Sequence, residues 1–234
     1  MVGIIGAMEV EVTRLKEAMQ DVKILKKASM EFYSGVLNGS EAVVVRSGIG
    51  KVNAGICTQI LVDVFGVNAI INTGIAGSLK NEINIGDIVL STDTLQHDVD
   101  ATGFGYEVGV IPQMETSCFV ADEMLRRTAK DCCLEVNPDI SVFEGRVVSG
   151  DQFISDKEKK NWIAGQFEGY CTEMEGAAIA QAAYLNGVPF LVIRAISDKA
   201  DDSATMDYPE FEKKAVEHSV KLVEAICEKL NETK

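Results

Sequence analysis

The sequence is poor in the residues that build metal sites. Its 234 residues include only 2 histidines, and none of its 6 cysteines stands in a C-x-x-C pair. Zinc sites made of cysteine and histidine need several such ligands at close spacing. We therefore expect no metal and no cofactor. The cysteines lie mostly inside apolar patterns, so we interpret them as reduced core thiols and expect a cytoplasmic protein.

Positive charge is also scarce. The chain has 22 Lys and Arg side chains against 36 Asp and Glu, which gives a net charge of −14. Nucleic acids and anionic membranes are held by fields of Lys and Arg, so we expect neither as a partner, and the charge weakly disfavours a polyphosphate substrate. A neutral or zwitterionic small molecule fits better. The sequence has no run of roughly 20 apolar residues for a membrane helix and no basic N-terminal segment typical of a secretory signal.

What the sequence does contain is a regular alternation of strand and helix patterns. We expect strands near residues 2–6, 31–37, 41–46, 68–72, 86–90, 141–148 and 189–194, and helices near 9–20, 51–65, 121–133, 156–167, 173–185 and 209–230. Asn38-Gly39 favours a hairpin turn, and Pro209 suits the first turn of the last helix. The alternation predicts a three-layer α/β fold in one domain over residues 1–234, with a mixed, mainly parallel sheet flanked by helices.

One segment, 94–114, breaks this alternation. It is long, has little periodicity, and carries Phe104, Tyr106, Ile111 and Pro112. Loops of this length in compact domains usually have a function or cover something. The aromatic and proline side chains favour a lid or a subunit contact, and the alternative is an ordinary surface excursion.

Polar and glycine-rich sequences follow several of the expected strands. They are GAMEVE at 6–11, SGIGK at 47–51, NTGIAG at 72–77, and the acidic clusters Glu173/Glu175 and Ser197-Asp198. The carboxyl ends of neighbouring parallel strands meet at one crevice, so these segments are expected to converge on one ligand site. The glycine loops match neither G-x-G-x-x-G nor a Walker A loop, and a plain strand–helix turn explains either loop equally well.

The acidic side chains in these segments are candidates for acid/base chemistry. Asp198 ends an apolar strand, where poor solvation would raise its pKa and keep it protonated nearer neutrality, as a general acid requires. Glu11 has a plainer alternative, a solvated carboxylate on a helix. Glu173 and Glu175 could likewise serve only to complement a helix dipole.

Six motifs occur in an order that resembles one known family. They are GIIGAMEVE at 3–11, SGIGKVNA at 47–54, NTGIAGSL at 72–79, SGDQFI at 149–154, EMEGAAIA at 173–180 and RAISD at 194–198. Together they closely resemble the bacterial methylthioadenosine/S-adenosylhomocysteine nucleosidases, which have the purine nucleoside phosphorylase-like fold. The resemblance covers essentially the whole chain. MEGAAIA and RAISD are shared with nucleoside phosphorylases, whereas the N-terminal motif is more specific to the nucleosidases.

The resemblance implies hydrolysis of the bond between adenine and ribose in 5′-methylthioadenosine, S-adenosylhomocysteine and 5′-deoxyadenosine. The transition state of such a reaction is oxocarbenium-like. By resemblance, Asp198 protonates adenine N7 and Glu11 activates the attacking water. Glu175 accepts hydrogen bonds from the ribose hydroxyls, and Met174 packs against the sugar.

The resemblance also implies the rest of the binding site. Phe153 would stack on the adenine, the Ile154 backbone would bind its edge, and Ser197 and Arg194 would support the Asp198 end. Phe104 and Pro112 would come from the partner of a homodimer to complete an apolar pocket for the 5′ substituent. The substrate-binding residues implied in this way are Met8, Ile49, Ile75, Ala76, Gly77, Phe104, Pro112, Phe153, Ile154, Glu173, Met174, Glu175, Arg194, Ser197 and Tyr208.

Two positions depart from the family pattern, and they leave the substrate preference open. Ile75 stands where Ser is often found, and Tyr208 stands where Phe is familiar. Three other functions remain as alternatives: a phosphorylase of the same fold, a hydrolase of futalosine-type nucleosides, and a non-catalytic nucleoside sensor. A phosphorylase would need cations for phosphate, a futalosine-type hydrolase would need a basic residue in its 5′ pocket, and a sensor would be expected to lack Glu11 or Asp198.

Overall fold

The structure is a computed structural model that describes residues 1–200 and 204–232, and the side chains of residues 1–200 and 211–232. The strands are β1 (Val2–Gly6), β2 (Gln20–Lys27), β3 (Met30–Leu37), β4 (Ser40–Arg46), β5 (Ala69–Ser78), β6 (Ile88–Gln96), β7 (Phe119–Val120), β8 (Val142–Ser149), β9 (Cys171–Glu173) and β10 (Phe190–Asp198). The helices are α1 (Glu9–Ala18), α2 (Lys51–Phe65), α3 (Glu123–Val136), α4 (Lys157–Phe167), α5 (Gly176–Leu185) and α6 (Ala204–Glu232), with a 3₁₀ turn η1 at Thr102–Phe104.

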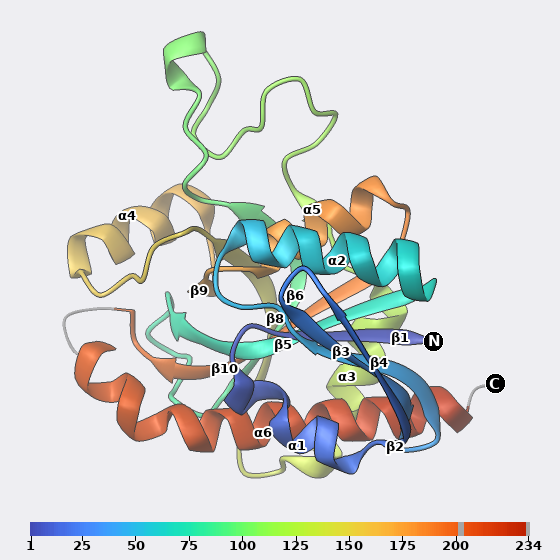
Figure 1. The fold of residues 1–234 in the computed structure, drawn as a ribbon. Coiled ribbons are helices and arrows are strands. Elements are labelled where there is room, and N and C mark those ends of the chain that lie inside the picture. Colours follow the sequence, from blue (N-terminus) through green and yellow to red (C-terminus); the bar gives the residue numbers. More distant parts are fainter. Residues whose placement is uncertain (201–203, 233–234) are drawn as a thin grey trace.

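All these strands join one mixed sheet, in the order β10-β6-β8-β9-β5-β1-β4-β3-β2, with β7 paired to β6. The neighbours β4, β1, β5 and β10 run parallel, whereas β2, β3 and β4 pair antiparallel. Strand β10 also pairs with β6, so the sheet closes into a ring through β5, β10, β6, β8 and β9. Helices cover both faces, with α2 and α5 on one side and α1 and α6 on the other (Figure 1). The expected α/β fold is confirmed.

The sequence located most elements, and local chemistry explains why. The Asn38-Gly39 turn joins β3 to β4 as predicted, and both of its residues have positive φ, which this turn type requires. The predicted pattern did not include β2, because every residue of this edge strand is exposed and no alternation of buried side chains marks it. Two helix starts were also wrong. Helix α6 begins at Ala204 and not near 209, and Glu173 ends a strand and does not open α5.

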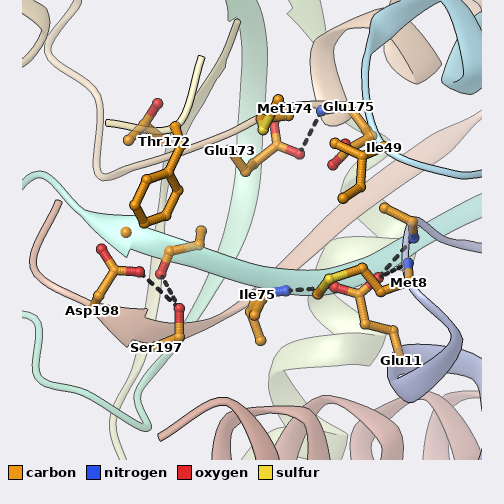
Figure 2. Close-up of a pocket in the computed structure, with 14 residues that line it drawn as sticks. Met8, Glu11, Ile49, Ile75, Thr172, Glu173, Met174, Glu175, Ser197 and Asp198 are labelled. Atoms are coloured by element: carbon orange, nitrogen blue, oxygen red, sulfur yellow. Dashed lines mark hydrogen bonds between the residues drawn. The ribbon is translucent and has the colours of Figure 1, made fainter. Parts of the chain in front are cut away.

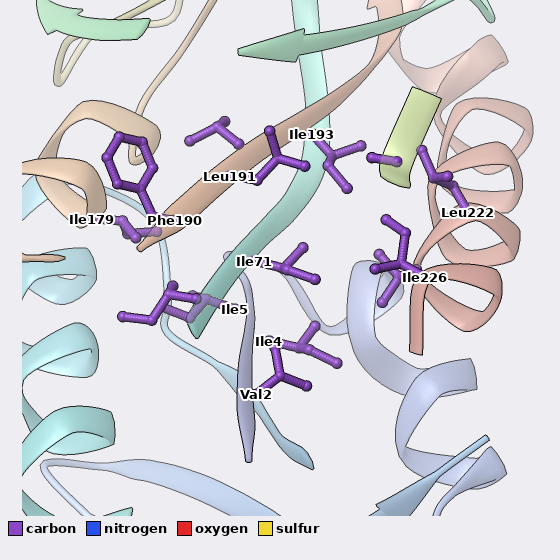
Figure 3. Close-up of a cluster of buried hydrophobic side chains, with 14 of the residues drawn as sticks. Val2, Ile4, Ile5, Ile71, Ile179, Phe190, Leu191, Ile193, Leu222 and Ile226 are labelled. Carbon is purple, nitrogen blue, oxygen red and sulfur yellow. The ribbon is translucent and has the colours of Figure 1, made fainter. Parts of the chain in front are cut away.

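The core lies between the sheet and its helices. Every residue of β1 is buried, because α6 covers one face of the strand while the opposite face is also packed. Figure 3 shows Ile4 and Ile71 pointing toward Leu222 and Ile226 of α6, with Ile5 on the other side of β1. The six cysteines are all free, and five of them are buried, as expected of core thiols. In the part of the chain that the structure describes, no helix has the length and apolarity needed to cross a membrane.

A matched pair of Leu→Ala substitutions tests this account of the core. Leu222 of α6 is fully buried, whereas Leu134 of α3 is 56% exposed. Leu222→Ala leaves a cavity under the sheet and should lower the free energy of unfolding by about 2–5 kcal/mol. Leu134→Ala should change it by less than about 0.5 kcal/mol. Denaturant titration of both variants measures the difference, and equal losses would contradict the predicted packing of α6.

Candidate active site

A cavity of about 400 Å³ opens at the carboxyl ends of β1, β5 and β10. This volume lies within the range of small-molecule sites. Figure 2 shows Glu11 and Asp198 at opposite ends of the cavity, with Glu175 and Met174 along a third side. The residues predicted from the sequence that line it are Met8, Glu11, Ile49, Ile75, Ala76, Gly77, Phe153, Glu173, Met174, Glu175, Ser197 and Asp198.

Glu11 enters the cavity because the chain turns sharply from β1 into α1. Its Oε2 accepts hydrogen bonds from the backbone N–H groups of Ala7 (2.7 Å) and Met8 (2.9 Å), so the side chain closes half of a capping box on the first turn. Its Oε1 accepts from the Ile75 N–H at 3.2 Å. Burial raises the pKa of Glu11, although the charge of Arg194 and these hydrogen bonds oppose the rise. The solvated-helix alternative for Glu11 is therefore wrong.

Arg194 is a buried cation outside the cavity lining, and its charge acts on lining carboxylates. The side chain is 1% exposed and donates hydrogen bonds to Glu173 and to Asn72. Its charge also acts on Glu11 and Glu175. The hydrogen-bond partners described for Arg194 are thus Glu173 and Asn72, and its support of the Asp198 end stays a prediction.

Gly74 makes the approach of Arg194 to Glu11 possible. A Cβ at this position would lie 2.6 Å from Glu11 Oε1 and would also collide with the guanidinium of Arg194. Only the absence of a side chain leaves room for both groups. The glycine in the NTGIAG segment thus has a packing role in the site, beyond that of a plain turn.

Glu173 and Glu175 have different surroundings although they are two residues apart. Glu173 ends β9 and accepts hydrogen bonds from Ser149 Oγ and from the N–H groups of Glu175 and Gly176, so it fixes the start of α5. Among the described residues, Glu175 accepts one hydrogen bond, from the Gly50 N–H at 2.8 Å. Burial, followed by the nearby charge of Glu173, raises the pKa of Glu175, and Arg194 opposes this rise. Glu173 is thus held by structural contacts, whereas Glu175 faces the cavity with fewer of them.

Asp198 forms the other end of the site. It is the last residue of β10 and is buried. Its Oδ2 accepts a hydrogen bond from Ser197 Oγ at 2.9 Å, and its Oδ1 accepts from the Ala200 N–H at 2.8 Å. Beside it, Phe153 is 52% exposed at the cavity rim, while Ile154 is buried and lines a small adjoining cavity together with Asp198.

Three predicted residues lie elsewhere or outside the described side chains. Phe104 is 87% exposed in the excursion that leaves the body after β6, and Pro112 lies in the same excursion (Figure 1). Neither lines the cavity of its own chain. The side chain of Tyr208 is outside the described residues. The structure adds Ala7 and Thr172 to the lining. Each directly precedes a residue predicted to line the site, Met8 and Glu173, and that adjacency in sequence is the signal that could have found them.

Among residues 1–200 and 204–232, no cluster of His, Cys, Asp and Glu side chains could hold a metal ion. The arrangement instead offers two buried carboxylates, Glu11 and Asp198, at opposite ends of a mainly apolar cavity, with Glu173 and Glu175 also in its lining. That is a suitable geometry for protonating one side of a bound molecule while water is activated on the other side.

The chain also resembles proteins of known family. A family model described as the phosphorylase superfamily matches residues 1–228. The chain belongs to this superfamily. It is 44% identical over 232 residues to a 5′-methylthioadenosine/S-adenosylhomocysteine nucleosidase from Exiguobacterium sp., with 99% of each chain covered. These findings confirm the resemblance drawn from the six motifs.

Solved structures of this superfamily agree with the fold. The nucleosidase from Neisseria meningitidis, in complex with methylthio-immucillin-A, superposes with a TM-score of 0.93 at 40% identity and covers 97% of this chain and 98% of its own. The futalosine hydrolase from Helicobacter pylori superposes with a TM-score of 0.92 at 34% identity, with 97% of each chain covered.

The buried cation gives a prediction about stability. Arg194→Met leaves the carboxylates of Glu11, Glu173 and Glu175 without their opposing charge, which should cost about 3–5 kcal/mol of unfolding free energy at pH 8. Burial raises the pKa of Glu11 and Glu175 in the fold, so as the pH falls toward 5 these groups take up protons and no longer need the cation. The loss should therefore be smaller at pH 5.

Arg126→Met is the control for this prediction. Arg126 pairs with Glu144, which is partly exposed and whose pKa Lys130 and Arg126 hold below the usual range. Removing Arg126 should cost no more than about 1 kcal/mol, with little change between pH 5 and pH 8. Unfolding titrations at both pH values measure the two variants, and a loss in Arg194→Met that does not depend on pH would contradict the charge argument.

Proposed function

We propose that this chain hydrolyses the N-glycosidic bond of 5′-methylthioadenosine and S-adenosylhomocysteine, and also that of 5′-deoxyadenosine, releasing adenine and the 5-substituted ribose. The observation that supports this most strongly is the pair Glu11 and Asp198, buried at opposite ends of one cavity. The similarity to the Exiguobacterium nucleosidase over nearly the whole chain supports the same assignment.

Asp198 is the proposed general acid. A purine leaves more readily when its N7 is protonated, because the electrons of the breaking bond then flow into a neutral base. Ser197 Oγ and the Ala200 N–H bind the two oxygens of Asp198 and fix the direction of the carboxyl group. Phe153, at the rim beside it, would stack on the adenine, and the backbone of Ile154 would bind the edge of the base.

Glu11 is the proposed general base, and Glu175 the ribose-binding carboxylate. A buried carboxylate with a raised pKa takes a proton from water more readily than a solvated one. Glu175 would accept hydrogen bonds from the ribose hydroxyls, and its negative charge would favour the oxocarbenium-like transition state. Met174, beside Glu175 in the cavity lining, would pack against the sugar.

We further propose that a homodimer completes the pocket for the 5′ substituent. Met8 and Ile49 supply apolar lining from the chain itself, and Ile49 is half exposed at the cavity. The excursion after β6, whose 3₁₀ turn η1 contains Phe104, projects from the body of the chain (Figure 1), and the Phe104 side chain is 87% exposed. An aromatic side chain presented to solvent in this way is suited to a partner, so Phe104 and Pro112 would enter the neighbour's pocket. The position of Tyr208 at this pocket stays a prediction.

Two related functions are weaker. A phosphorylase needs cations for phosphate, but the cavity lining among the described residues contains neither Lys nor Arg. Arg194 is committed to Glu173 and Asn72, and Arg46 pairs with Glu9 outside the lining. The likeness to a futalosine hydrolase keeps futalosine-type nucleosides as a second candidate substrate class, although their carboxylate would also favour a basic residue in the pocket.

The central test measures adenine release from 5′-methylthioadenosine, S-adenosylhomocysteine, 5′-deoxyadenosine and aminofutalosine. Glu11→Gln and Asp198→Asn should each lower kcat/KM by roughly 10²–10⁴-fold, because each removes one proton-transfer group. Glu9→Gln is the matched control for Glu11→Gln, since Glu9 lies on the same turn of α1 but is exposed and outside the cavity lining.

Cleavage should proceed without phosphate and yield free sugar. A strict requirement for phosphate, with a sugar phosphate as product, would show that the chain is a phosphorylase. Adenine binding without turnover, unchanged by Asp198→Asn, would instead favour a sensor. Near-normal kcat/KM in Glu11→Gln or Asp198→Asn would refute the role proposed for that residue.

The shared pocket has its own test. Phe104→Ala should raise KM for 5′-methylthioadenosine about 10-fold through lost apolar contact, whereas Met124→Ala, an exposed side chain on α3, should not change it. Mixing Phe104→Ala with Asp198→Asn chains should restore activity above the sum of the two separate variants, because a mixed dimer contains one intact site. No gain on mixing, under conditions in which chains exchange, would refute the partner contribution.

A further inference from the structure

The first turn of α2 is held by two carboxylates from distant segments. Gly50, at the N-cap, has a φ of 98°, which favours glycine, and it offers no side-chain cap to the helix. Its N–H donates to Glu175 Oε1 at 2.8 Å, and the next N–H, of Lys51, donates to Asp151 Oδ1 at 2.9 Å. The position of the Glu175 carboxylate is therefore tied to the position of this turn.

Asp98 fixes the turn from the other side. Its Oδ1 accepts a hydrogen bond from Lys51 Nζ at 2.6 Å, and its Oδ2 accepts from the Asp151 N–H at 2.9 Å. The Asp98 carboxylate thereby binds both the Lys51 side chain and the backbone of Asp151. Asp151 in turn binds the Lys51 backbone through its own side chain. Lys51 also donates to Gln96 Oε1, and Gln96 donates to Gln181 on α5. The network joins α2, β6, the loop after β8, and α5.

The ion pair at the centre of this network is mostly shielded from water. The side chains of Lys51 and Asp98 are 19% and 14% exposed. Burial alone would raise the pKa of Asp98, but the hydrogen bond from Lys51, the Asp151 N–H and the charge of Lys51 together hold it below the usual range. Asp98 is therefore ionised at neutral pH, and charge-assisted hydrogen bonds of this kind are stronger and more directional than neutral ones.

We propose that Asp98 is a positioning residue for the ribose end of the site. Asp98 is not part of the cavity lining. It holds the first turn of α2 where the Gly50 N–H restrains Glu175, and it holds the Asp151 loop, which also carries Phe153, against the same turn. The inference rests on the proposed function of Glu175 as the ribose-binding carboxylate. Asp98 also lies at the start of the excursion that carries Phe104. Its contacts therefore join this excursion to the turn of α2 beside Glu175.

A double-mutant cycle with Glu175 tests the proposal. Asp98→Asn keeps the size of the side chain, but its charge is lost and only one oxygen remains to accept the two hydrogen bonds. In the wild-type background it should lower kcat/KM for 5′-methylthioadenosine roughly 10-fold, mostly through kcat, because a misplaced Glu175 stabilises the cationic transition state less. In a Glu175→Gln background the same change should cost less than about 3-fold.

Glu144→Gln is the matched control. Like Asp98, Glu144 accepts two hydrogen bonds, in its case from the cations Arg126 and Lys130, but it is more exposed (27% against 14%) and lies outside the network. This variant should keep kcat/KM within about 2-fold of the wild type even if the loss of its ion pairs lowers the unfolding midpoint. Equal losses for Asp98→Asn in both backgrounds, or a loss no greater than that of Glu144→Gln, would overturn the proposal.

Amide hydrogen exchange separates this proposal from the proposed function. Protection of the Gly50 and Lys51 amides should fall at least several-fold in Asp98→Asn and stay unchanged in Glu144→Gln, because Asp98 holds the turn that carries both amides and binds the backbone of Asp151, the acceptor for Lys51. If the wild type releases no adenine, the proposed function fails, and the exchange measurement still decides the positioning role. Unchanged protection of Gly50 in Asp98→Asn would overturn it regardless of activity.

Discussion

The buried ion pair between Arg194 and Glu173 is the interaction on which the rest of the site depends. Arg194 also places its charge near Glu11 and Glu175, so one cation serves carboxylates from three segments of the chain. Burying three carboxylates without a cation would be strongly destabilising. The first turn of α1, the end of β9 and the start of α5 therefore meet where β10 delivers this guanidinium. Gly74 on β5 leaves the space for it.

Arg194 offsets only part of the effect of burial on Glu11 and Glu175, and the proposed chemistry requires this partial compensation. Burial still raises the pKa of Glu11 and of Glu175 despite Arg194. A general base of this kind can accept a proton from water, while a fully paired carboxylate would be a weaker base. Asp198 stands apart at the far end of the cavity, where Ser197 and a backbone N–H bind it. The proposed general acid, Asp198, is thus separated from the proposed general base, Glu11, by the length of the cavity.

Some of this could be predicted from residues close together in sequence. The Asn38-Gly39 turn and the apolar run before Asp198 are local patterns, and both placed their elements correctly. The hydrogen bonds of Arg194 to Glu173 and Asn72 could not be predicted, because these residues belong to different segments of the chain. Four residues of extended strand separate Arg194 from Asp198 by roughly 13 Å, so membership of one motif does not by itself bring the two side chains together. Strand β2 was missed because an exposed edge strand carries no burial pattern.

The sequence by itself determined the class of fold, most strands and helices, and which segments carry the candidate site, because periodicity and turn chemistry act over a few residues. The tertiary structure alone decided that the Glu11 carboxylate accepts hydrogen bonds from the N–H groups of Ala7, Met8 and Ile75. It alone decided that the sheet closes through the pairing of β10 with β6. It also decided that Asp98 contacts the turn beside Glu175. These features depend on strand register and on burial, which bring together residues that lie far apart along the chain.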